Sequence, residues 1–107
     1  MDPTRHLTEL TKSLNATVSR LAKDGQTLAA AEREYKITLA KECMKLRVEG
    51  VPVTLIDKVA YGLEDVAEAR FKRDIADSVY KANLEAVNAL KLQLRLIAAQ
   101  VDREWRS

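Results

Sequence analysis

Apolar residues at seven-residue intervals are the feature that most constrains the fold of this chain. The first half contains the series Leu7, Leu14, Leu21, Leu28 and Tyr35. The second half contains the series Tyr80, Val87, Leu94 and Val101. Seven residues make two turns of an α-helix and return to the same face, whereas a β-strand alternates its faces at every residue. The spacing therefore predicts two long amphipathic helices.

The ends of these helices follow from glycine, proline and capping residues. Asp2 suits the N-cap and Pro3 the first turn, so the first helix is predicted over about 3–49. The seven-residue series keeps its phase through Gly25, which favours a continuous or gently kinked helix. Gly50 ends it. No glycine or proline occurs from residue 63 to 105, so the second long helix is predicted there.

A corner of about 50–62 separates the two long helices. Pro52 favours an extended backbone, and Thr54 is the predicted cap of a short helix that ends at Gly62 in a left-handed conformation. We expect the apolar side chains of the corner to close this end of the fold; these are Val51, Val53, Leu55 and Ile56. The predicted fold is all-α, a single domain over 1–107. It is a long antiparallel two-helix hairpin with a short helix at the corner, which oligomerises into a helical bundle.

Oligomerisation is expected because a two-helix hairpin leaves the flanks of both helices in water. Leu92 and Leu96 lie off the main apolar stripe of the second helix and need a partner, most simply a second copy of the chain. The predicted oligomer interface consists of Leu84, Leu92, Leu96 and Trp105. Asn83 falls within the stripe, either as a buried polar residue that fixes the helix register or as a surface residue.

Composition and charge narrow the function classes. Hydrophobic residues make up 47% of the 107 residues and charged residues 32%, which is not the composition of a disordered chain. The net charge of +2, from 18 basic and 16 acidic residues, is too balanced to indicate a dedicated nucleic-acid-binding protein. Cys43 is the single cysteine and fits a reducing cytoplasm. Lys91 and Arg95 interrupt the most apolar stretch, so no membrane association is expected.

Few residues could carry chemistry. The one histidine, His6, and Glu9 are three residues apart, but a metal-binding helical bundle needs several such pairs. Cys43 has no histidine near it in the sequence to activate it. The sequence therefore predicts no catalytic residues, no metal and no cofactor, and so a protein that is not an enzyme.

The corner also resembles part of a DNA-binding helix-turn-helix. Gly50 and Ile56 match the second half of that pattern, but Leu46 stands where a small residue is usual and Glu49 where an apolar one is usual. We therefore interpret the corner as structural. Basic residues around it could still contact phosphate or nucleic acid; these are Lys41, Lys45, Arg47, Lys58, Arg70, Lys72 and Arg73. Interleaved acidic residues make a solvated mixed-charge surface the alternative.

The stretch "LAKECMKLRVEGVPVTLIDKVAYG" and the helix that follows, up to "REW", resemble a group of small helical proteins encoded by phages and prophages of Gram-positive bacteria. The resemblance covers residues 39–105 and is clearest at "EGVPVT" and "REW". It implies an accessory role in the cytoplasm of a bacterial host. We expect the protein to act by binding a host or phage protein, to inhibit a defence or assist recombination. The alternative is nucleic-acid or nucleotide binding through the basic residues near the corner.

Overall fold

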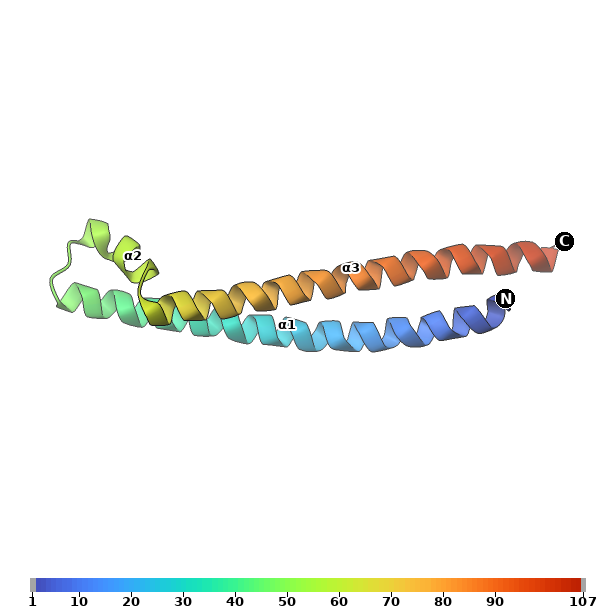
Figure 1. Cartoon of the computed structure of the whole chain (residues 1–107), viewed down its shortest axis with the longest axis horizontal. Helices are drawn as coiled ribbons and strands as arrows, with labels where there is room; N and C mark the ends of the chain where they lie inside the picture. Colours follow the sequence, from blue (N-terminus) through green and yellow to red (C-terminus); the bar gives the residue numbers. More distant parts are fainter. Residues whose placement is uncertain (1, 107) are drawn as a thin grey trace. The chain divides into compact units, whose positions relative to one another are not determined.

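The computed structural model describes residues 2–106, and it is all-α over that range. Its helices are α1 (Pro3–Val48), α2 (Val53–Tyr61) and α3 (Glu64–Arg106) (Figure 1). The chain divides into two compact units. Unit 1 combines residues 2–24 with 80–106, and unit 2 is residues 25–79. A long helix packs against another in each, which confirms the predicted helical fold class.

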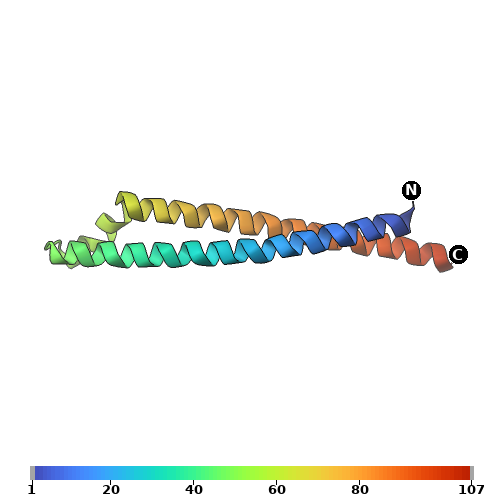
Figure 2. The same cartoon turned by 90° about the horizontal axis from the view of Figure 1, so that it is seen from below.

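α1 is one continuous helix that passes through Gly25, and Figure 2 draws it as an unbroken ribbon. The Asp2 carboxylate accepts a hydrogen bond of 3.0 Å from the Thr4 N–H, so Asp2 is the N-cap as predicted. Gly50 follows the other end with a φ of 87°. There the Gly50 N–H donates to the Arg47 carbonyl and the Val51 N–H to the Leu46 carbonyl, both at 3.1 Å. This pair of bonds is a Schellman motif, which satisfies carbonyls that the helix leaves free.

Two predicted details of α2 are wrong. The helix begins at Val53 and not after a Thr54 cap, because Pro52, with φ −56° and ψ 136°, is itself the N-cap and makes no side-chain capping bond. The proline ring fixes a φ that can lead directly into a helix. Gly62 has a φ of −90° and is right-handed, not left-handed. α3 then starts at Glu64, where the Asp65 carboxylate accepts a 3.0 Å hydrogen bond from the Val66 N–H.

The core of unit 2 is a cluster of Leu46, Ile56 and Ala60, which packs α2 onto the end of α1. Four half-buried residues surround the cluster: Leu39, Cys43, Val51 and Leu63. Cys43 is therefore a small apolar side chain that packs against the core.

Two of the four corner residues expected to close the fold do not. Val51 and Ile56 pack in the cluster, but Val53 is 76% exposed and Leu55 is 46% exposed. The helical period accounts for Leu55, because a helix of nine residues with Ile56 and Ala60 on its buried face turns Leu55 toward solvent. Val53 shares the face of Ile56 but is the first residue of α2 and lies outside the core cluster.

α1 and α3 run antiparallel within unit 2. Leu63, just before α3, packs against the cluster at the end of α1, whereas Arg73, further along α3, lies over the ring of Tyr35, which is earlier in α1. The buried side of this part of α3 consists of Val66, Ala69 and Ala76, at spacings of three and seven residues. These spacings produce a narrow apolar stripe along the helix.

Unit 1 has its own stripes of buried and half-buried residues on α1 and α3. The most buried side chains are Leu10 and Thr17 of α1 and Val87 of α3. The polar Thr17 is buried here, whereas its apolar neighbour Val18 is 45% exposed. A threonine is accommodated there because its hydroxyl donates a 2.8 Å hydrogen bond to the Ser13 carbonyl, so no polar group is left unsatisfied.

Asn83 lies in the α3 stripe of unit 1, and its side-chain amide donates to the carboxylate of Asp24 in α1. Both residues are half-buried. Asn83 is therefore a polar residue of the contact between the two helices and not a surface residue. Within the part of the chain that the structure describes, no helix has the length and apolarity needed to cross a bilayer.

Candidate functional site

The seven basic residues predicted as a possible phosphate site all belong to unit 2, and two of them are held by aromatic rings. The guanidinium carbon of Arg70 lies 3.5 Å from the centre of the Tyr61 ring, and its Nη1 donates to the Tyr61 carbonyl at 2.9 Å. Arg73 lies 4.4 Å from the centre of the Tyr35 ring. Such stacking stabilises the cation and fixes its orientation.

Arg73 also has a carboxylate partner. Its Nη2 and Nε donate to the same Asp74 oxygen at 2.9 and 3.1 Å. This hydrogen bonding raises the pKa of Arg73 above its ordinary value, with Coulomb attraction from Asp74 adding to the shift. A phosphate would have to compete with these contacts for Arg70 and Arg73.

The lysines and Arg47 are more accessible. Lys45 lies 3.3 Å from the Glu42 carboxylate, but its side chain is 56% exposed, so that ion pair is weak. The other cations of the set are all exposed; they are Lys41, Arg47, Lys58 and Lys72. The cations available for contact with a phosphate are therefore mainly the exposed lysines and not the stacked arginines.

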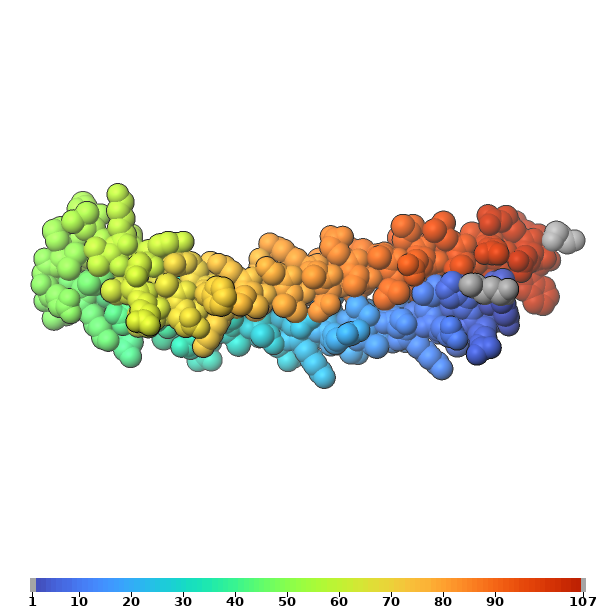
Figure 3. Space-filling model, viewed as in Figure 1, coloured from blue at the N-terminus to red at the C-terminus, as the bar shows by residue number. Residues whose placement is uncertain are grey.

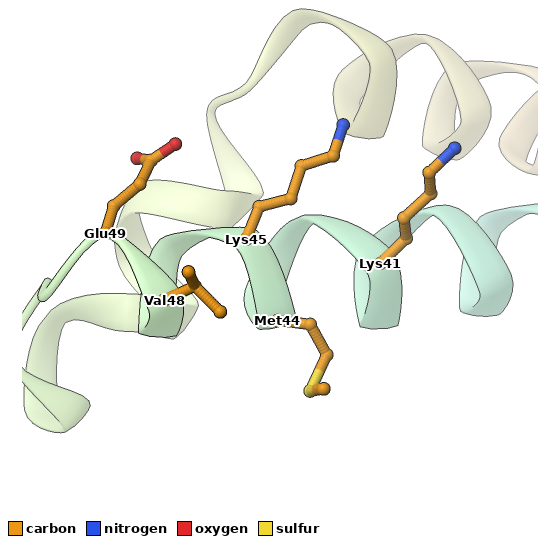
Figure 4. A pocket seen from close by; sticks show the side chains of 5 residues that line it. All are labelled: Lys41, Met44, Lys45, Val48 and Glu49. Atoms are coloured by element: carbon orange, nitrogen blue, oxygen red, sulfur yellow. The ribbon is translucent and has the colours of Figure 1, made fainter.

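Apolar side chains stand in water at the end of α1. Figure 4 shows Met44 extending from the helix on the side opposite the ammonium groups of Lys41 and Lys45, with Val48 one turn further along. Met44 is 64% exposed and Val48 is 85% exposed. Glu49 completes the lining of this open hollow. An apolar strip edged by charges is typical of a protein-binding surface.

A groove between α1 and α2 adjoins this strip and shares Met44 with it. It has a volume of about 470 Å³. Its floor contains Cys43 and Ile56 of the core cluster, and its walls are the two helices. The full lining consists of Ala40, Cys43, Met44, Arg47, Val53, Ile56 and Asp57. The sequence interpretation assigned Val53 to the core, so it did not find this groove.

The predicted oligomer residues lie on α3 of unit 1, and all four are exposed. Their exposed fractions are 38% for Leu84, 53% for Leu92, 62% for Leu96 and 85% for Trp105. Leu92 and Leu96 are one turn apart, on a side of α3 that the half-buried residues Leu90, Leu94 and Ile97 do not use. This part of α3, orange to red in Figure 3, presents a continuous outer surface.

His6 is half-buried, and its Nδ1 is buried without a hydrogen-bond partner. It lines a shallow hollow with Asp2, Arg5 and Glu9. Over residues 2–106, no group of three or more His, Cys, Asp or Glu side chains is placed to hold a metal ion. No protein-family model, curated protein or solved structure matches the chain.

Proposed function

We propose that this protein is a non-enzymatic accessory protein that acts by binding another protein and that works as a homo-oligomer. The observation that carries the proposal is the exposure of large apolar side chains on a helix face, above all Leu92 and Leu96 at 53% and 62%. Two leucines one turn apart form the kind of ridge that packs into a facing helix. Exposed apolar patches of this kind mark interaction surfaces in folded proteins.

The proposed assembly builds on the helices of both units. We propose that the units continue one another as a single long antiparallel hairpin with coiled-coil packing, and that copies of the hairpin associate through the α3 surface formed by Leu84, Leu92, Leu96 and Trp105. The stripes at three- and four-residue spacing in each unit support this packing mode. The resemblance to small helical phage and prophage proteins suggests that the partner is a host or phage protein in the cytoplasm of an infected bacterium.

The proposal is tested by affinity capture from infected host cells with three baits. These are the wild type, the Leu92→Glu/Leu96→Glu variant and the matched control Arg95→Glu, which changes charge on the same helix without removing a leucine. We expect a protein that the wild type and Arg95→Glu retain and the double variant loses. A captured set that is the same for all three baits would exclude a partner whose binding depends on the α3 surface or on the assembly that this surface forms.

The alternative is nucleic-acid or nucleotide binding, and the exposed cations Lys41, Lys58 and Lys72 support it. Salt separates the two functions. Binding to phosphates releases counterions, and this release becomes less favourable as the salt concentration rises, so the affinity falls steeply, whereas an apolar contact responds little. Capture that survives high salt supports protein binding. Capture of nucleic acid that is lost in high salt and in a Lys41→Ala/Lys58→Ala/Lys72→Ala variant would favour the alternative.

A further inference from the structure

We infer that the groove between α1 and α2 in unit 2 is a self-association site, occupied by the same groove of a second copy. This contact is separate from the proposed α3 surface and goes beyond it. The groove has an apolar floor, walls from two different helices and one charged residue on each wall. The charges have opposite signs, because α1 contributes Arg47 and α2 contributes Asp57.

The apolar part of the groove is open to a partner. Met44 and Val53 are 64% and 76% exposed, although both line the groove beside the buried side chain of Ile56. Val48, at 85% exposure, extends the apolar surface along α1. Ala40 and Cys43 are small, so a facing side chain such as Met44 of a second copy can approach the floor closely. Covering these groups would remove several large apolar side chains from water.

The charges identify a second copy as the occupant. Arg47 and Asp57 line the same groove, yet within residues 2–106 neither side chain is engaged in an ion pair or hydrogen bond. In a two-fold dimer the same patch meets itself, so residue i of one copy faces residue j of the other and the reverse. Arg47 would then face the partner's Asp57, and Asp57 the partner's Arg47. A partner of a single charge sign would leave one of the two residues opposed by a like charge.

The experiment uses charge reversal in the Leu92→Glu/Leu96→Glu background, which removes the α3 contact and leaves only the groove. Mass is measured by sedimentation equilibrium over a wide concentration range, and helicity by circular dichroism. The background protein is expected to reach twice the chain mass of 12.0 kDa. Arg47→Glu or Asp57→Arg, added alone, places two pairs of like charges opposite each other in every dimer. Each variant should therefore lower the affinity between the copies by about tenfold or more. Met44→Glu should weaken it without altering either charge.

Mixing the two charge variants provides the decisive arm. Glu at position 47 of one chain then faces Arg at position 57 of the other, while the native Asp57 and Arg47 face each other, so a heterodimer should form from two chains that are separately monomeric. A background protein that stays at 12.0 kDa at every concentration overturns the inference while leaving the α3 proposal standing. Single variants that remain dimeric, or a mixture that remains monomeric, overturn the two-fold pairing.

Discussion

At the scale of single residues, Gly50 and Gly62 both follow the end of a helix, but they differ in backbone conformation. Gly50 has a φ of 87°, and Gly62 has a φ of −90°. A Cβ would meet nothing within 4 Å at Gly50 and only the Val59 carbonyl at 3.9 Å at Gly62, so any difference comes from the backbone. Gly50→Ala should lower the free energy of unfolding by about 1 kcal/mol, and Gly62→Ala should change it by less than about 0.5 kcal/mol or raise it. Urea denaturation measures both, and equal stabilities would contradict the left-handed assignment of Gly50.

Asp24 and Asn83 form a polar contact within otherwise apolar stripes of unit 1. Asn83→Leu removes the amide donor and leaves the half-buried Asp24 carboxylate unsatisfied, so it should destabilise by about 1–3 kcal/mol. The double variant Asp24→Leu/Asn83→Leu replaces both partners by apolar groups and should recover that loss or exceed wild-type stability. The four proteins of this double-mutant cycle are compared by thermal unfolding. Single-substitution losses that simply add up in the double variant would show that the contact does not couple the two residues.

At the scale of the elements, α2 is held by one face of its nine residues. Ile56 is 8% exposed in the core cluster, whereas Val53 is 76% exposed. Ile56→Asp forces a charge into an apolar site and should destabilise by more than about 2 kcal/mol. Val53→Asp changes an exposed position near the helix N-terminus, where a negative charge is tolerated, and should cost less than about 0.5 kcal/mol. Chemical denaturation distinguishes them, and a large loss for Val53→Asp would place that side chain in the core.

The long helices were predictable from the sequence, and the short one only in part. Seven-residue spacing identifies α1 and α3 because many residues agree, and one glycine at position 25 does not outweigh them. α2 has too few residues for its period to separate Ile56 from Val53. Capping preferences favoured Thr54, but the fixed φ of Pro52 decided the helix start. The Asp24–Asn83 contact joins residues 59 positions apart, and no local pattern reveals such a pair.

The contacts of the basic residues near the corner could not be predicted from local sequence patterns either. Their number is visible in the sequence, but the stacking of Arg70 on Tyr61 and of Arg73 on Tyr35 depends on how the helices of unit 2 pack. The groove was missed for a related reason, since it exists only because α2 folds back onto α1 at Leu46. The exposed leucines of α3 were found because they are off a strong stripe on one helix, which is a local property.

At the scale of the whole molecule, the exposed leucines of α3 predict the behaviour of the chain in solution. Leu92 and Leu96 remain 53% and 62% exposed after the buried stripe of unit 1 is satisfied, so self-association is the direct way to remove them from water. Multi-angle light scattering at micromolar concentration should give a mass that is a multiple of 12.0 kDa. Leu92→Glu/Leu96→Glu should lower that mass, because charged side chains would have to lose their hydration in the contact. Arg95→Glu, on an exposed position between the two leucines, should leave it unchanged. A wild-type mass of 12.0 kDa would remove the assembly proposed for α3, and an equal effect of the double variant and Arg95→Glu would show that charge rather than apolar contact holds the copies together.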